Sequence, residues 1–385
     1  MKLAELFWTR NPYNIVSIYG RNAKKAAIHD GLPPVYPRCG AQFMVTLAEV
    51  ALRAQVTAAT VSNVLRNPQK VKPTTVERVM AAVRELGYRP NLTARALAEG
   101  RTSTLALMLS NISNPFYPEF VLEAETAARR RGYFLLVCNT DDDPAIARAY
   151  LDKIAGTLAA GVIVMNTDVS AGELADIAQR GSALVLCMWE SAQATRALPC
   201  VTVDYTHAGG LAAAHLYELS HRRIGALLGE GSGGPQSTRL RGFVEALAAR
   251  GVAADTVKVH ACRDSIEAGY EAARALLGEQ PKLTALFATN DLMAIGAIQA
   301  ATDIGMRVPQ DLSVIGLTNI HLAHQFRPAL TTVGFPTAAI ASIAVALTID
   351  RIEGVKPKRD AYKVPLSELV IRDTTAQAPK ASRRK

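Results

Sequence analysis

Between residues 104 and 305 the sequence alternates between short apolar runs and longer amphipathic segments, which restricts the fold more than any other feature. The apolar runs form two series, one at 104–110, 133–140, 161–166 and 183–188, and one at 200–204, 223–229, 257–261 and 284–290. Segments with helical periodicity separate the runs. Strands that alternate with helices indicate right-handed βαβ units and parallel sheets. The two series therefore predict an α/β region of two lobes.

The turns that follow these strands contain the first candidate binding residues. Ligands of open α/β sheets bind beyond the carboxyl ends of the strands, and aromatic faces among a few polar groups suit sugars or nucleobases. The candidate side chains in these turns are Phe116, Tyr117, Trp189, Asp204, Arg239, Asp264, Asn290 and Asp291.

A second region, before residue 90, has a different periodicity. Apolar residues predict two short amphipathic helices at 47–54 and 58–65, joined by a turn at 55–57, and a third helix that begins at Thr74. Thr74 and Glu77 form a T-x-x-E capping box, and Gly87 suits the end of that helix. The result is a three-helix unit of about 45 residues. The pattern is typical of helix-turn-helix DNA-binding domains, but small helical bundles with other roles share it.

The charge is distributed unevenly along the chain. Of the net charge of +9, residues 1–43 carry +4, residues 44–101 carry +5 and residues 380–385 carry +4, which leaves −4 for residues 102–379. Basic segments at the two ends and a mildly acidic middle favour a polyanionic partner for the three-helix unit. The alternative is that the basic tails are only solvated.

Other classes of protein are disfavoured by what the sequence lacks. No run of about 18 apolar residues offers a membrane span, and residues 1–43 lack the apolar core of an export signal, so we expect a cytoplasmic protein. Five cysteines without a CxxC spacing argue against a disulfide framework and a zinc ribbon. His321 and His324 form an HxxH pair with no further ligand at the usual spacing. We expect no metal, no cofactor and no membrane partner.

Two segments of the three-helix unit resemble the DNA-binding domain of the LacI/GalR family of transcription regulators nearly position for position. They are TLAEVALRAQVTAATVSNVLRN (46–67) and ERVMAAVRELGYRPN (77–91). The resemblance extends through nearly all of residues 46–373 and includes NPFY, RLRGF, FATNDLMAIGA, RVPQDLSVIG and PALTTV. It implies a two-lobed sensor like periplasmic sugar-binding proteins, joined to a helix-turn-helix domain. It further implies a repressor that binds a pseudo-palindromic operator as a homodimer or tetramer, under the control of a small-molecule effector.

The resemblance also implies roles for individual residues in DNA binding. It places Thr57, Thr60 and Ser62 near phosphates, and Ala58, Ala59 and Asn63 at base edges in the major groove. Relatives often carry larger polar side chains where Ala58 and Ala59 stand, and alanine offers only a methyl contact. Direct readout would therefore fall mainly on Asn63, which pairs best with adenine.

The segment at 92–102 corresponds to the hinge helix of the family. In that family the hinge helix orders on DNA and wedges a leucine into the minor groove, and here Leu97 matches the wedge, with Arg95 beside it. The alternative is that Leu97 packs on the sensor.

For the effector, the resemblance places Phe116, Tyr117, Trp189, Arg239 and Asp291 where relatives contact their ligands. The alternatives are that Phe116 and Trp189 cover the core, and that Arg239 and Asp291 form an ion pair between the lobes. A sugar is the leading effector class, and RGYFLLVCNTDDD (131–143) resembles ribose-type members. Two pairs depart from the common family pattern, Thr318 with Asn319 and Ser220 with His221.

We therefore expect a helix-turn-helix domain at 44–90, a hinge at 91–102, a sensor at 103–375 and a basic tail at 376–385. Lobe one should comprise about 103–204 and 308–339, and lobe two about 205–307 and 340–375. Residues 1–43 lie outside the resemblance; either translation begins at Met44, or they form a basic arm. Two other functions compete with a regulator, namely a solute-binding receptor and a sugar-processing α/β enzyme. However, GEGSGG at 229–234 lacks the GK[ST] ending of a phosphate loop.

Overall fold

The structure is a computed structural model, and it describes residues 45–89, 102–154, 158–165, 169–189, 198–229, 234–355 and 361–379. The chain divides between Pro90 and Asn91 into two compact units. The fold class predicted from the sequence is confirmed, because one unit is a three-helix domain and the other contains two α/β lobes.

The N-terminal unit consists of α1 (Leu47–Arg53), α2 (Ala58–Arg66), the short 3-10 helix η1 (Pro68–Lys70) and α3 (Pro73–Leu86). A small apolar core holds the helices together, and its buried members are Val50, Ala51, Ala54, Val61, Val64, Val79 and Ala82. Gln55, in the turn between α1 and α2, has a φ of 52°. That left-handed conformation favours glycine over any residue with a Cβ.

The helix ends differ in part from the prediction. α3 begins at Pro73, its N-cap is Lys72, and no side chain caps it, so the predicted capping box at Thr74 and Glu77 is wrong. Proline at the first helical position needs no hydrogen-bond acceptor for its nitrogen, which explains the earlier start. A capping box lies instead at α1, where Thr46 and Glu49 bond reciprocally. Gly87 ends α3 with a φ of 63°, as predicted.

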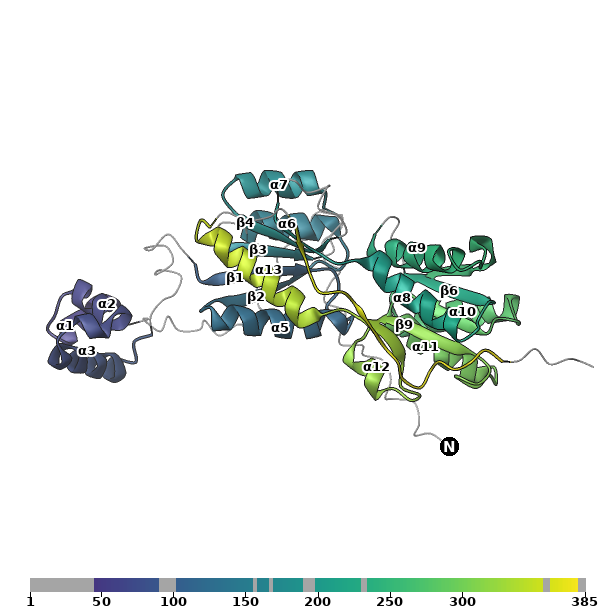
Figure 1. Cartoon of the computed structure of the whole chain (residues 1–385). Helices are drawn as coiled ribbons and strands as arrows, with labels where there is room; N and C mark the ends of the chain where they lie inside the picture. Colours follow the sequence, from purple (N-terminus) through teal and green to yellow (C-terminus); the bar gives the residue numbers. More distant parts are fainter. Residues whose placement is uncertain are drawn as a thin grey trace, which may run out of the picture. The chain divides into compact units, whose positions relative to one another are not determined.

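Lobe one is built on a six-stranded parallel sheet. The strands are β1 (Thr104–Leu109), β2 (Phe134–Asn139), β3 (Gly161–Met165), β4 (Ala183–Trp189), β5 (Cys200–Thr202) and β11 (Ala361–Lys363), in the order β11-β5-β4-β3-β1-β2. α5 (Phe116–Arg130) and α13 (Thr337–Ile352) lie side by side on one face (Figure 1). α6 (Pro144–Ile154) and α7 (Ala171–Gln179) contribute to a separate apolar cluster on the other face.

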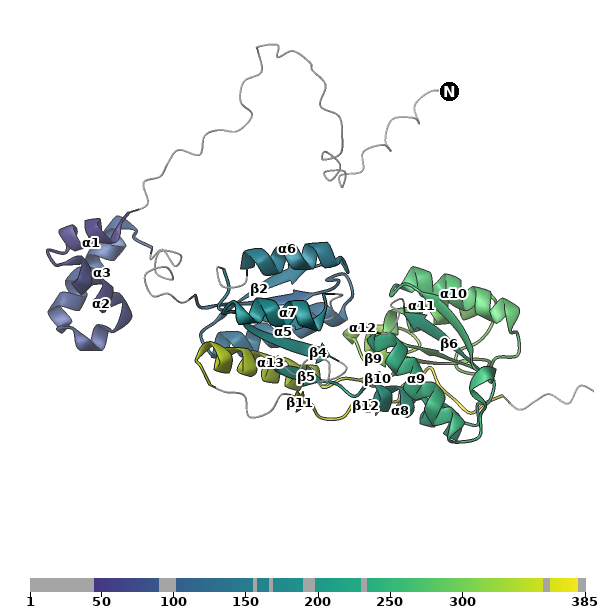
Figure 2. The ribbon, with the colours of Figure 1, turned by 90° about the horizontal axis from the view of Figure 1, so that it is seen from above.

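Lobe two has a second six-stranded sheet. Its strands are β6 (Ile224–Gly229), β7 (Lys258–Cys262), β8 (Ala285–Ala288), β9 (Ser313–Thr318), β10 (Thr331–Gly334) and β12 (Glu368–Val370), in the order β12-β10-β9-β8-β6-β7. β12 is antiparallel to β10, and the other pairs are parallel. α8 (Tyr205–Glu218) packs on α9 (Pro235–Ala248), and α10 (Ile266–Glu279) packs on α11 (Asp291–Asp303), in two layers (Figure 2). The short helices η3 (Ala254–Thr256) and α12 (His321–Gln325) complete the lobe.

The lobe assignment predicted from the sequence is wrong for β9, β10, most of α13 and β11, but it is right for β12, which was predicted in lobe two and lies there. β9 and β10 belong to the second sheet, whereas α13 and β11 belong to lobe one. The described chain crosses between the lobes three times, after β5, after β10 and after β11. The prediction failed because periodicity identifies a strand but not the sheet that the strand joins.

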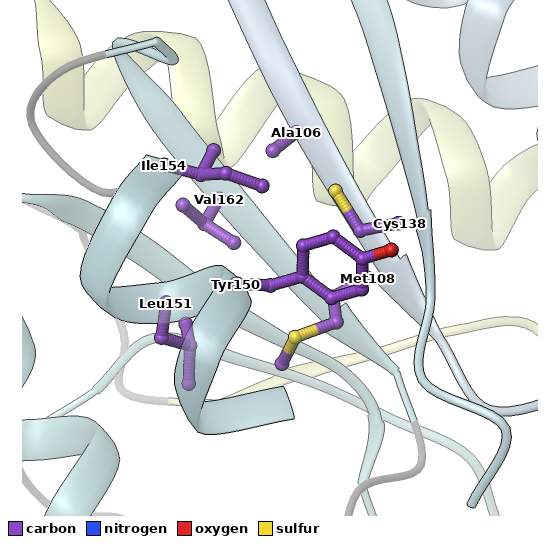
Figure 3. A pocket seen from close by; sticks show the side chains of 7 residues that line it. All are labelled: Ala106, Met108, Cys138, Tyr150, Leu151, Ile154 and Val162. Carbon is purple, nitrogen blue, oxygen red and sulfur yellow. The ribbon is translucent and has the colours of Figure 1, made fainter. Parts of the chain in front are cut away.

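A small void lies in the outer core of lobe one, between the sheet and α6 (Figure 3). Its volume is about 10 Å³, and it is lined by Ala106, Met108, Cys138, Tyr150, Leu151, Ile154 and Val162. That volume has room for about one water molecule, and the atoms that line the void are apolar. The void is therefore a packing defect and not a ligand site.

Candidate functional sites

The exposed face of α2 is the candidate DNA-binding surface. Thr57 is the N-cap of this helix, where its hydroxyl accepts a hydrogen bond from the Thr60 N–H at 3.2 Å and lies 2.9 Å from the Thr60 hydroxyl. Val61 and Val64 point into the core, and Ala58, Ala59 and Asn63 are exposed. Of those three, Asn63 is the one whose side chain can donate and accept hydrogen bonds.

Basic residues flank that surface. Arg66 at the end of α2, Lys70 in η1 and Lys72 before α3 are all exposed. Arg53 has a different role, since its guanidinium donates to Glu85 Oε1 at 2.8 and 3.1 Å and ties α1 to α3. Ser62 and Thr60 are half-buried, and the predicted hinge residues Arg95 and Leu97 lie outside the described residues.

In lobe two, the buried Arg239 lies on the first turns of α9. Its Nη1 donates to the Thr289 carbonyl oxygen at 2.8 Å and to Gln236 Oε1 at 3.3 Å. Its Nε is buried and has no hydrogen-bond partner among the described residues. A buried donor without a partner costs about 1–3 kcal/mol, so this nitrogen is a candidate donor to a ligand.

Asp264 and Gln236 lie beside this arginine at the carboxyl ends of β6 and β7. Gln236 Nε2 donates to Asp264 Oδ2 at 2.6 Å. Gly229, the last residue of β6, makes the approach possible, because a Cβ there would lie 2.2 Å from Asp264 Oδ1. The predicted candidates Arg239 and Asp264 are thus brought together, with Gln236 as an additional neighbour.

Asn290 and Asp291 have different environments although they are adjacent. Asn290 caps α11 by accepting from the Met293 N–H at 3.0 Å, and its Nδ2 is buried without a partner in the described part of the chain. Asp291 is fully buried and accepts from the Thr332 hydroxyl at 2.5 Å, the Ile320 N–H at 2.9 Å and the Thr318 hydroxyl at 3.2 Å. Burial raises the pKa of Asp291 to about 6, against these hydrogen bonds and the charge of Arg372.

The prediction that Asp291 contacts an effector is therefore corrected. Its carboxylate joins α11 to β9 and β10 and presents no oxygen to solvent. Nor does it pair with Arg239, whose Nη1 donates instead to the Thr289 carbonyl oxygen and to Gln236. Asn290 Nδ2 meets no acceptor in good hydrogen-bonding geometry, but the Asn290 side chain lies close enough to Asp264 to lower the pKa of that carboxyl.

Aromatic rings connect this site to lobe one. The Phe335 ring makes edge contacts with Tyr205 at 5.6 Å and with Phe116 at 6.3 Å between centroids. The Arg239 guanidinium carbon lies 5.1 Å from the Tyr205 centroid and 5.2 Å from that of Phe335. Phe116 therefore contacts a ring that also faces Arg239. Tyr117 is buried next to Phe116 and accepts from the Ser110 hydroxyl at 2.6 Å.

Trp189 and Asp204 lie apart from this group. Trp189 packs against the cluster formed by α6 and α7 on the outer face of lobe one. A bulge between β4 and β5, with Met188 at a φ of 56°, precedes it. Asp204 is exposed and caps α8, since its Oδ1 accepts from the His207 N–H at 2.8 Å. These contacts favour the structural alternative for Trp189 and give Asp204 a capping role.

Both units are similar to known protein families. Residues 46–91 match the family described as bacterial regulatory proteins, lacI family, and residues 213–375 match the periplasmic binding protein-like domain. The chain is 33% identical over 339 residues to the HTH-type transcriptional repressor PurR of Pectobacterium carotovorum, covering 87% of this chain and 98% of that protein. The chain belongs to the LacI family. The HTH-type transcriptional regulator DegA of Bacillus subtilis is similar at 33% identity over 332 residues, 86% of this chain and 98% of DegA.

Solved structures of this family have the same fold. A lac repressor dimer bound to operator and the anti-inducer ONPF matches with a TM-score of 0.77 at 23% identity, covering 86% of this chain and 99% of that one. The transcriptional regulator CelR in complex with cellobiose matches with a TM-score of 0.64 at 29% identity, over the same 86% and 99%. The LacI-family chain thus carries a DNA-binding domain and a sensor domain.

Two further findings concern the described residues alone. No helix among them has the length and apolar character needed to cross a membrane. In the same ranges, no three His, Cys, Asp or Glu side chains are grouped as metal ligands, and the rings of His321 and His324 lie 6.5 Å apart.

Proposed function

We propose that this chain is a transcriptional repressor whose affinity for an operator is set by a small molecule bound beside Arg239. One observation carries the proposal: the same chain has an exposed recognition helix in a helix-turn-helix unit and, in its sensor, a buried Arg239 Nε that has no hydrogen-bond partner among the described residues. The PurR and DegA similarities, each over 98% of those proteins, support the pairing of these parts.

The effector we propose is a sugar. Sugars present hydroxyl oxygens to donors such as Arg239 Nε and Asn290 Nδ2, and the apolar faces of their rings pack on aromatic side chains. Phe335 and Tyr205 supply aromatic rings beside that arginine. Two regulators with related structures were solved with sugars, CelR with cellobiose and a regulator from Alkaliphilus metalliredigens with D-xylulofuranose.

The operator complex we propose contains a homodimer. β2 is an edge strand of the first sheet, and Phe134, Leu136 and Val137 on it are exposed, as is Leu122 on the adjacent α5. An apolar edge strand left open is a site for aggregation, so proteins cover such edges. A second copy of this chain would cover it, and two recognition helices would then bind a pseudo-palindromic site.

In the complex, Thr57, Thr60 and Ser62 would contact phosphates, Asn63 would contact a base, and Leu97 with Arg95 would enter the minor groove. A Leu97→Ala variant should then lose operator affinity selectively. Equal loss on operator and random DNA would count against the wedge.

Selection of genomic fragments by the full chain, followed by gel shifts with and without sugars, tests the function. We expect a palindromic consensus and a sugar that changes the operator affinity. By linkage, that sugar must bind the operator complex with an affinity changed by the same factor. Sugar binding without any retained DNA would indicate a solute receptor, and turnover of the sugar would indicate an enzyme; either result would overturn the proposal.

A further inference from the structure

Gln236 lies between a buried arginine and a carboxylate that would ordinarily pair with each other. Its Oε1 accepts from Arg239 Nη1 at 3.3 Å, and its Nε2 donates to Asp264 Oδ2 at 2.6 Å. Within the described residues there is no ion pair between Arg239 and Asp264, although the charge of Arg239 lowers the pKa of Asp264 against the effect of burial. A direct arginine–carboxylate pair could be bidentate, and both of its partners would be charged, so it would be stronger than the bond between Arg239 and the neutral amide.

The local sequence explains how Gln236 reaches this position. α9 begins at Pro235, so Gln236 is its second residue and lies one turn before Arg239 on the same side of the helix. A Cβ on Gly229 would lie 2.8 Å from the Gln236 side-chain amide carbon and 2.2 Å from Asp264 Oδ1. Gln236 and Asp264 are therefore packed directly on the end of β6.

The neutral amide satisfies one donor of the arginine and one acceptor of the aspartate. It leaves the Arg239 Nε without a partner, at the cost of a buried unsatisfied donor. Direct pairing would remove that cost, but it would also occupy the guanidinium.

We propose that Gln236 is a positioning residue that prevents Arg239 from closing onto Asp264 and so keeps the arginine available to the effector. This inference rests on the proposed function of the Arg239 site. Gln236 was not among the candidate binding residues predicted from the sequence.

The test compares thermal unfolding of the full chain without ligand for wild type, Gln236→Ala, Asp264→Asn and the double variant. If Gln236 separates the pair, Gln236→Ala permits a direct pair and raises the Tm of the sensor by about 2–4 °C. The gain should vanish in the double variant, because a neutral asparagine in place of Asp264 cannot form an ion pair with the arginine. Gln325→Ala, at an exposed glutamine of α12 whose side chain has no hydrogen bond among the described residues, is the matched control and should leave the Tm unchanged.

A purely structural role predicts the opposite result. In that case Gln236→Ala lowers the Tm, and the effects of Gln236→Ala and Asp264→Asn add without coupling; this outcome would overturn the proposal. Gel shifts on a selected genomic fragment test the proposed function separately from the role of Gln236. A wild-type chain that retains no DNA refutes the operator function, whereas the Tm comparison still decides the role of Gln236.

Discussion

Glu119 Oε1 accepts a hydrogen bond from the His321 backbone N–H at 2.7 Å. The bond joins the first turn of α5 in lobe one to the first residue of α12 in lobe two. Phe116, on the same turn of α5, contacts Phe335 at the crossover from β10 to α13. The first turn of α5 therefore holds the lobes together through one polar and one aromatic contact.

Removing the polar contact should make the lobes open more easily. We expect Glu119→Ala to cost about 1 kcal/mol, so amide exchange at His321 should be about fivefold faster. Hydrogen exchange followed by mass spectrometry measures this effect. Glu123→Ala, an exposed position on the same helix, is the control, and equal exchange in both variants would contradict the role of Glu119.

Replacing Asn63 should relax base recognition at a single position. On the proposed operator, Asn63→Ala should lose about 1–3 kcal/mol of discrimination in favour of adenine at the base facing this residue. Binding to a library of sites randomised at each position measures the loss. Lys70→Ala, at an exposed basic residue of η1, should weaken all sequences alike. Full discrimination by Asn63→Ala would refute its assigned role.

The turn between α1 and α2 should be stabilised by glycine. Gln55 has a φ of 52°, a conformation in which a Cβ destabilises the folded state by about 1–2 kcal/mol. Glycine removes this strain, but its greater freedom in the unfolded chain offsets about 0.5–1 kcal/mol of the stabilisation. Gln55→Gly should therefore raise the Tm of the DNA-binding unit. Gln69→Gly, inside η1, should lower it instead. Calorimetry measures the Tm of both variants, and a lower Tm for Gln55→Gly than for wild type would contradict the expectation.

The free energy of unfolding should depend on pH through the ionisation of Asp291. Its pKa of about 6 in the folded state exceeds the ordinary value, so the folded chain holds this proton more tightly than the unfolded chain. The stabilisation is therefore present below about pH 4 and is lost as the pH rises through 6, a change of about 3 kcal/mol. The stability advantage of wild type over Asp291→Asn should narrow by most of that amount between pH 4 and 7 in denaturant titrations. A constant advantage would show that the carboxyl titrates normally.

The described cysteines should resist alkylation in the folded chain. Burial raises the pKa of the Cys138 thiol to about 11 and also raises that of Cys187, so little thiolate exists near neutral pH. Peptide mapping after iodoacetamide treatment should find Cys138 unmodified in native protein and modified in urea. Rapid native labelling of Cys138 would show that lobe one opens.

The sequence predicted elements better than it predicted contacts between them. The amphipathic spacing of Val50, Val61 and Val64 is local and sufficed to place α1 and α2. In contrast, the choice between Asn290 and Asp291 depends on which side chain caps α11 and which turns toward β9 and β10, and no periodicity encodes that choice.

Two other features depend on contacts that the sequence pattern does not encode. The side of the sheet on which Trp189 packs follows from the bulge at Met188. The role of Gln236 depends on the approach of the β7 turn to Gly229, which brings together residues far apart in the chain.

The three crossovers have a consequence for synthesis. Neither lobe is continuous in sequence: the first sheet needs β11 at residues 361–363, and the second needs β12 at 368–370. Domains fold as units while the ribosome is still elongating the chain. The three-helix unit, complete by Leu86, has all its residues early, whereas both sensor sheets must wait with unpaired edges for the last strands. A truncated product would therefore retain a folded DNA-binding unit on an unfinished sensor.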